Sequence, residues 1–391
     1  MSLSQHHNLF PVDNGNDVLE RLLRGASDLE KWEAWARVES TKRLCVCLLM
    51  GDAMFSHEYE VKPILRFDLL KYVVPGDLAT FEAPLPAAWW KLLLKSRSGI
   101  VTLYALNLPQ SIGNYEIHGL LAICWAQVSE RQHRGLLDTN NPNYAQSVNP
   151  AWALAEDTHT RSTAGVLSEL YDAYKDTFAT LNPNCLVSWH NTCMNLAADP
   201  LILQDAAGRN GAVRAKTALE LVAQWSETAT ARRACLHAAQ TFRIMSQRKI
   251  SEGMMFQSET ALFDSALVLG LYLYLRPQPI SGDVAGGEPF QKESELLDDV
   301  DWTHIGVLGL SHEQEEDRPL GGSIIAPTNC KSRSFVLRDG LPVSFEGVSC
   351  PGEFRSAQRI FLAFSTLLSH VAPWNARRYC PILRTLSACN F

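Results

Sequence analysis

The sequence predicts an all-α protein: an irregular multi-helix regulatory domain that carries a partly disordered acidic insertion. Three observations favour this class. Apolar residues recur at helical intervals over most of the chain, strand-like alternation is confined to residues 334–345, and the apolar run 259–277 ends at a proline, as helices do. The 391 residues suffice for one large domain or two smaller ones.

The first predicted helix covers residues 28–56, with Asp28 as its N-cap. Glu39 and Arg43 stand four residues apart, the spacing of a helical ion pair. A proline-rich irregular connection, 57–90, follows. The later predicted helices are, in order, 112–130, 151–180, 189–199, a pair within 212–248, 259–277 and 353–371.

The predicted organisation has three parts. Residues 1–277 form the main helical body. Residues 278–350 are rich in glycine and acidic residues and are interpreted as a linker or insertion with room for a short hairpin. Residues 351–391 are expected to supply a C-terminal helix that packs back on the body.

Composition narrows the function classes. The net charge of -7 and the pI near 5.9 argue against a nucleic-acid surface spread over the chain. The longest apolar runs, 266–275 and 118–126, are too short to cross a bilayer, so no membrane role is expected. Ten cysteines without a spaced framework, and no evident signal peptide, favour a reducing compartment.

Metal and cofactor motifs are not recognised. Cys45 and Cys47 are one residue apart, and the His190–Cys193 spacing has no second pair to complete a zinc site. The acidic stretch 296–302, "LLDDVDW", resembles a magnesium-diphosphate motif but lies in the predicted linker. "GLSHE" at 309–313 lacks the second glycine of a nucleophile elbow. We therefore predict no catalytic, cofactor-binding or metal-binding residues.

The segment 231–250, "ARRACLHAAQTFRIMSQRKI", poses the question of a Cys–His dyad. On a helix, Cys235 and His237 point about 200° apart, so they cannot face each other. Cys235 belongs to the apolar stripe, and His237 points off it. Arg232, Arg233 and Arg243 also lie outside the stripe, where their guanidinium groups can pair with acids or meet solvent. The segment is interpreted as a packing helix.

Several segments together resemble the fungal-specific transcription factor domain, in the version that accompanies C2H2 zinc fingers. They occur in the family's order and cover nearly the whole chain outside 278–350. They are Trp32, Trp35, Glu39, Ser40 and Arg43 running into "LLMGD"; "APLPAAWW" (83–90); "IHGLLAICW" (117–125); "WHNTCMNLAADPLILQDAAGRNG" (189–211); Trp225 with "ARRACLHAAQTFRI"; "ALFDSALVLGLYLY" (261–274); and "RIFLAFSTLLSHVAPWNARRYCPILRTL" (359–386).

The resemblance implies an all-helical regulatory domain without enzymatic activity, which lies C-terminal to DNA-binding fingers and controls them. Such regulators often govern nutrient or secondary-metabolite genes. The family's zinc belongs to the fingers, and this chain has no CxxC…HxxxH pattern, so no cofactor is expected. The chain is expected to lack the fingers and the first helices of the domain, and to reach DNA only indirectly or through that missing module.

The partners implied by the resemblance are proteins of the transcription machinery or another regulator, and the implied location is the nucleus. The acidic stretch 293–317 is interpreted as a solvated linker, with a transcription-activation segment as the alternative. A helical small-molecule-binding protein or enzyme of a fungal biosynthetic pathway is the alternative function. A poorly folded remnant is a third.

Overall fold

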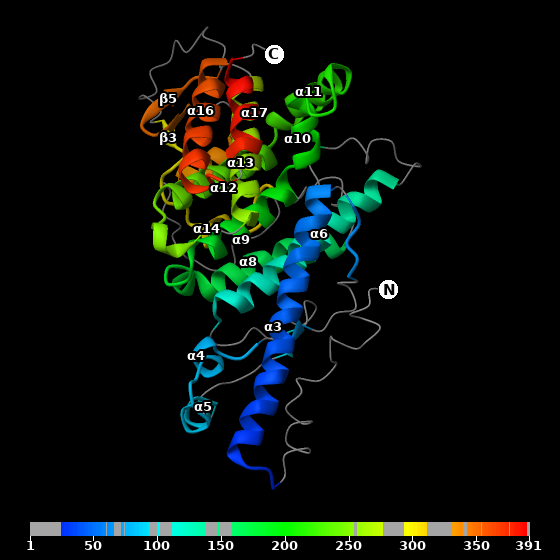
Figure 1. Ribbon diagram of the computed structural model, residues 1–391. Coiled ribbons are helices and arrows are strands. Elements are labelled where there is room, and N and C mark those ends of the chain that lie inside the picture. Colours follow the sequence, from blue (N-terminus) through cyan, green and yellow to red (C-terminus); the bar gives the residue numbers. More distant parts are fainter. Residues whose placement is uncertain are drawn as a thin grey trace, which may run out of the picture. The chain divides into compact units, whose positions relative to one another are not determined.

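The described part of the chain is predominantly helical, which confirms the predicted class (Figure 1). The computed structural model describes residues 25–59, 61–65, 72–73, 75–93, 100–101, 112–137, 148, 158–253, 256–276, 293–310, 331–338, 342–352, 354–374 and 376–388. The chain divides into two compact units. Unit 1 comprises 1–134 and 169–185, and unit 2 comprises 135–168 and 186–391.

Unit 1 is built on the long helix α3 (Asp28–Tyr59) and on α6 (Asn114–Leu137), which extends three residues past the unit boundary. Its smaller elements are β1 (Tyr72–Val73), α4 (Leu78–Phe81), α5 (Pro86–Leu93) and β2 (Ile100–Val101), with β1 and β2 antiparallel. The helices α8 (Thr158–Phe178) and α9 (Pro183–Ala197) each contribute to both units.

The start of α3 is fixed by Ser27 rather than by Asp28. The Ser27 hydroxyl accepts a hydrogen bond from the Glu30 amide, and the Glu30 carboxylate accepts one from the Ser27 amide at 2.7 Å. This reciprocal arrangement is a capping box, which satisfies two amide donors that a helix start leaves open. The helix was predicted correctly, and its cap was placed one residue too late.

Glu39 and Arg43 both bind a loop glycine instead of forming the predicted ion pair with each other. The Glu39 carboxylate accepts the Gly76 amide at 2.6 Å, and the Arg43 guanidinium donates to the Gly76 carbonyl at 2.7 Å. Lys42 supplies the ion pair of Glu39, at 2.5 Å. All three side chains are buried. Two charge-assisted hydrogen bonds, one from its amide and one to its carbonyl, therefore hold Gly76 to α3.

Beside Gly76, an aromatic cluster joins α3 to α5. The Trp35 ring lies 5.7 Å from Trp89 and 6.4 Å from Phe81, measured between ring centroids. Trp35 and Trp89 are buried, and tilted rings at this separation add attraction beyond the area that they bury. The tryptophans of two segments that carry the family resemblance therefore meet in one core.

Unit 2 holds most of the buried apolar residues. Its helices beyond α8 and α9 are α10 (Pro200–Ala206), α11 (Ala212–Ser226), α12 (Ala229–Ser246), η3 (Ile250–Glu252), α13 (Phe256–Leu275), α14 (Trp302–Ile305), α15 (Lys331–Leu337), α16 (Phe354–Val371) and α17 (Ala376–Ala388). A three-stranded sheet of β3 (Ser294–Glu295), β4 (Val343–Phe345) and β5 (Val348–Cys350) lies among them, with β3 parallel and β5 antiparallel to β4.

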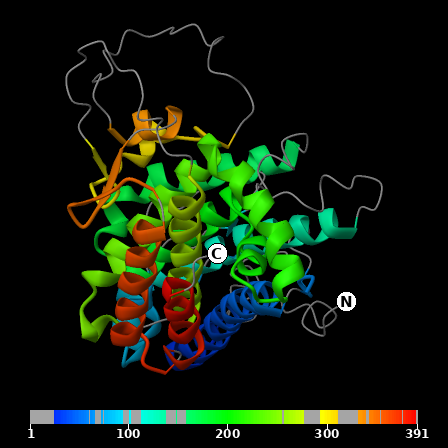
Figure 2. The ribbon, with the colours of Figure 1, turned by 90° about the horizontal axis from the view of Figure 1, so that it is seen from above.

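The helices α13, α16 and α17 lie side by side, with α12 against α13 (Figures 1 and 2). Gly270 lets α13 and α16 approach, because a Cβ at this position would lie only 2.3 Å from the Phe361 ring. Phe361 is fully buried, so its ring occupies the space that any larger residue at 270 would need.

Within 278–350, the described residues pack into unit 2. Leu296 and Trp302 are buried, and Gln240 of α12 donates to the Asp298 carbonyl at 2.8 Å. The strands β4 and β5 form a hairpin in the range where room for one was predicted. The strand-like alternation at 334–338 was misleading, because 331–337 is helical.

The C-terminal region holds two helices, whereas one was predicted. The second, α17, contains Pro381 in its interior, and a proline there normally argues against a helix. The α17 side chains Tyr379, Cys380, Leu383 and Leu386 are buried. This apolar face packs α17 against α16 and stabilises a helix that local sequence disfavours.

Candidate functional site

The most unusual buried group in unit 2 is a pair of histidines beside a tryptophan. His190 of α9 and His237 of α12 approach with 3.0 Å between their Nδ1 atoms. The His237 ring stacks on Trp302, the first residue of α14, at 3.9 Å and an interplanar angle of 14°. Trp189 contacts His190, His237 and Trp302 edge-on. We call these four residues the histidine cluster.

Hydrogen bonds to the main chain hold the histidine cluster in place. The Trp189 indole donates to the Leu167 carbonyl at 2.9 Å. The Asp301 carboxylate accepts the His304 amide at 3.1 Å and caps α14. Arg233 donates to the carbonyls of Gly306 and Leu308, each at 2.8 Å, and so fixes the chain that leaves α14.

Both histidines are neutral at pH 7. Burial lowers the pKa of His190 to about 3, and burial together with the neighbouring Arg233 lowers the pKa of His237 well below its usual value. One Nδ1 must donate and the other accept, so protonation of both nitrogens on both rings would break the contact. The Nε2 of His237 is buried and has no hydrogen-bond partner among the described residues.

The histidine cluster is closed to solvent. The exposed fractions are 1% for His190, 0% for His237 and 5% for Trp302, and the rings themselves fill the space between the helices. A general acid or base must reach its substrate within hydrogen-bond distance. The two imidazoles are enclosed by the two tryptophans and by each other, so the cluster packs α9, α12 and α14 together.

Unit 1 contains a buried Cys–His pair, Cys185 and His118. The two residues are 67 positions apart in the sequence, so their spacing gave no sign of the contact. The Cys185 sulfur lies 3.3 Å from Nε2 of His118 on α6. Burial raises the pKa of the Cys185 thiol to about 12 and lowers the pKa of His118 to about 4. A cysteine nucleophile requires the thiolate, and this pair stays neutral at pH 7. The contact is therefore structural.

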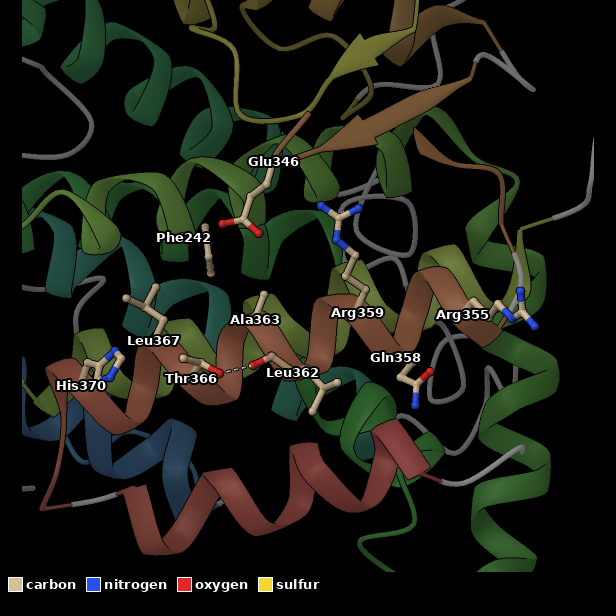
Figure 3. Close-up of a pocket in the computed structure, with 10 residues that line it drawn as sticks. All are labelled: Phe242, Glu346, Arg355, Gln358, Arg359, Leu362, Ala363, Thr366, Leu367 and His370. Atoms are coloured by element: carbon tan, nitrogen blue, oxygen red, sulfur yellow. Dashed lines mark hydrogen bonds between the residues drawn. The ribbon is translucent and has the colours of Figure 1, made fainter. Parts of the chain in front are cut away.

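A solvent-open groove runs along α16 (Figure 3). Its volume is about 550 Å³. Its wall and floor come from α12, from the turn between β4 and β5, and from the outer face of α16. The lining residues are Phe242, Glu346, Arg355, Gln358, Arg359, Leu362, Ala363, Thr366, Leu367 and His370. We call it the α16 groove.

The helix of the rejected Cys–His dyad is packed as predicted, but more completely. Cys235 and His237 point at different neighbours. Cys235 lies near Tyr272 and Arg232, whereas His237 contacts the other members of the histidine cluster. Of the arginines outside the stripe, Arg243 pairs with Asp299 at 2.5 Å, whereas Arg232 and Arg233 do not face solvent. Both are buried and donate to backbone carbonyls.

The other residues weighed from sequence are not brought together as a site. Cys45 is buried and Cys47 exposed, and His190 pairs with His237 rather than with Cys193. Across the described residues, no group of three or more His, Cys, Asp or Glu side chains is arranged to hold a metal ion. None of the described helices has the length and hydropathy to span a membrane.

Comparison with known protein families, with curated proteins and with solved structures finds no match. The groove residues of α16 carry a periodic signal in the sequence. Arg355, Arg359, Leu362, Thr366 and His370 follow one another at steps of four, three, four and four, which places them on one helix face. The opposite face holds the buried residues Ile360, Phe361, Phe364 and Leu368.

Proposed function

We propose that the chain is a transcription-regulatory helical domain of the fungal-specific transcription factor type. It acts through protein contacts in the nucleus, on nutrient or secondary-metabolite genes, and takes DNA binding from a separate module. The support is the order of the family-like segments along an all-helical chain.

One structural observation carries the proposal furthest: the residues of those segments link the segments to one another. The Trp225 indole donates to the Ala197 carbonyl at 2.9 Å, which joins two of them. Gly270 and Phe361 join two more by close contact. Segments that carry the resemblance thus pack together within unit 2, as the segments of one domain do, and this supports the family interpretation.

The acidic stretch 293–317 contributes to the fold as well as to charge. Of its apolar residues, Leu296 and Trp302 are buried in unit 2. An activation segment would need such residues free for a partner. We therefore place the regulatory contacts on the helical surface rather than in this stretch.

The experiment is a reporter assay in fungal cells. The chain is fused to a heterologous DNA-binding domain, and the DNA-binding domain alone serves as the control. We expect a change in reporter output. We also expect the fluorescently tagged chain to accumulate in the nucleus. Unchanged output from a folded, nuclear fusion would contradict the proposal.

A helical small-molecule-binding protein is the second candidate. The α16 groove favours it, because about 550 Å³ falls within the range of ligand pockets. Mass spectrometry of the purified chain under native conditions would detect a retained small molecule, which the regulatory proposal does not require.

A further inference from the structure

The α16 groove has the chemistry of a peptide-binding surface. Its apolar lining residues are Phe242, Ala363 and Leu367, which lie together, and Leu362, which lies on the opposite edge of α16 (Figure 3). Leu362 is 45% exposed. From Arg355 to His370 the lining extends over about 22 Å of helix, at about 1.5 Å per residue. That length matches four turns of a docked helix.

Positive charge is concentrated at one end of the groove. Arg355 and Arg359 lie at one end and His370 at the other, and Glu346 is the one acidic residue of the lining. The local charge is opposite to that of the whole chain, whose net charge is -7. From residue 354 to the end, the chain contains no Asp or Glu, and its arginines are Arg355, Arg359, Arg377, Arg378 and Arg384.

The two groove arginines have unused donors. Arg355 is exposed and makes no ion pair with any described residue. Arg359 donates to the Phe345 carbonyl at 2.5 Å through Nη2, but its Nη1 is buried and lacks a partner within the described part of the chain. Because Nη1 of Arg359 is buried, the donors that a partner's carboxylate can reach are those of Arg355, and Arg359 adds positive charge beside them.

Glu346 lies in the hairpin turn between β4 and β5, and its side chain lines the same groove as Arg359 (Figure 3). Glu346 and Gly347 have φ values of 53° and 72°, which form the tight two-residue turn between β4 and β5. The Glu295 carboxylate accepts both turn amides, from Glu346 at 3.1 Å and from Gly347 at 2.9 Å. These two hydrogen bonds fix the turn. The negative charge of Glu346 at the rim of the groove would repel a polyanion that lay along the whole groove.

We propose that the α16 groove binds an acidic amphipathic helical segment of a partner protein. Its apolar residues pack on Leu362, Ala363 and Leu367, and its carboxylates pair with Arg355, beside the positive charge of Arg359. Helices dock in this manner when an apolar stripe meets an apolar groove flanked by opposite charge. The inference rests on the groove alone and stands whether or not the chain regulates transcription.

The test uses the full chain and a fluorescein-labelled 16-residue helical peptide, with leucine and phenylalanine at i, i+3, i+4 and i+7 and glutamate on the flanks. Fluorescence anisotropy measures Kd. We expect saturable binding that Arg355→Glu and Leu362→Glu each weaken about tenfold. Both side chains are exposed, so neither change threatens folding. Arg377→Glu on α17 removes the same charge outside the groove and should leave Kd unchanged.

Charge exchange separates specific docking from general attraction. A peptide with lysine in place of every glutamate should bind the parent chain poorly and bind the Arg355→Glu, Arg359→Glu double variant better than the parent. Three results would overturn the proposal: no saturation up to millimolar peptide, equal weakening by Arg377→Glu, or displacement of the peptide by laurate or duplex DNA at lower concentration than by unlabelled peptide.

Discussion

The contact between Gly270 and Phe361 gives the most direct test of how unit 2 is packed. Replacement of Gly270 by alanine would place a Cβ 2.3 Å from two carbons of the Phe361 ring and 2.9 Å from a third. Carbon atoms pack favourably at about 3.5–4.0 Å, so the new methyl group is more than about 1 Å too close. The ring is fully buried and can move only if α13 and α16 separate.

The expected magnitude combines two opposing effects. Overpacking of a core costs about 1–3 kcal/mol and occasionally more, and a violation by rigid ring carbons belongs at the upper end. Alanine gains about 1 kcal/mol over glycine inside a helix. We therefore expect a net loss of about 2 kcal/mol. Gly165→Ala in α8 is the matched control, because nothing lies within 4 Å of its new Cβ, and it should stabilise by about 0.5–1 kcal/mol.

Urea denaturation followed by far-ultraviolet circular dichroism measures both changes as shifts in the free energy of unfolding. The double variant Gly270→Ala, Phe361→Leu should recover part of the loss, because leucine vacates the space of the ring. We expect a coupling energy of about 1 kcal/mol or more between the two sites. If Gly270→Ala stabilises the chain as Gly165→Ala does, α13 and α16 do not meet at this point and the packing argument fails.

Two further predictions concern ionisation and reactivity. Since burial lowers the pKa values of His118 to about 4 and of His190 to about 3, and that of His237 well below 6.5, the unfolded chain binds protons first on acidification. The free energy of unfolding should therefore stay constant above about pH 6.5. Below that pH it should fall by up to about 1.4 kcal/mol per pH unit for each histidine. A urea midpoint that does not change between pH 7 and pH 5 would contradict this expectation. Cys47 is exposed and should react with a maleimide in the native protein. Cys235 should react only in denaturant, because burial raises the pKa of its thiol far above the usual value. Mass spectrometry of the labelled peptides distinguishes the two cysteines.

The periodicity of apolar residues located the helices, because each helix needs one apolar face. That pattern is visible within the short stretch of sequence that forms the helix. The predicted helices 28–56 and 259–277 agree with α3 and α13 to within a few residues. The failures occurred where tertiary packing overrode local preference. Pro381 hid α17, and the alternation of residues 334–338 suggested a strand where 331–337 is helical.

The buried polar groups could not be predicted for a different reason. His190 and His237 are 47 residues apart, and Cys185 and His118 are 67 apart, so only the fold brings each pair together. The α12 helix reads as amphipathic in sequence, yet every residue from 230 to 242 is buried. Arginine outside an apolar stripe normally indicates solvent, but Arg232 and Arg233 here satisfy backbone carbonyls of distant segments.

The motif residues that suggest the family are occupied with holding the fold together, and this constrains where function can reside. Glu39 and Arg43 form hydrogen bonds with the backbone of Gly76, and the Trp225 indole donates to the Ala197 carbonyl. Loss of one partner from such a buried, charge-assisted contact leaves the other unpaired, so these positions tolerate little change whatever the protein does. A partner can only be recognised by side chains that the fold leaves free. In unit 2 the α16 groove offers such side chains, with Arg355 as the clearest example, and a search for binding partners should begin there.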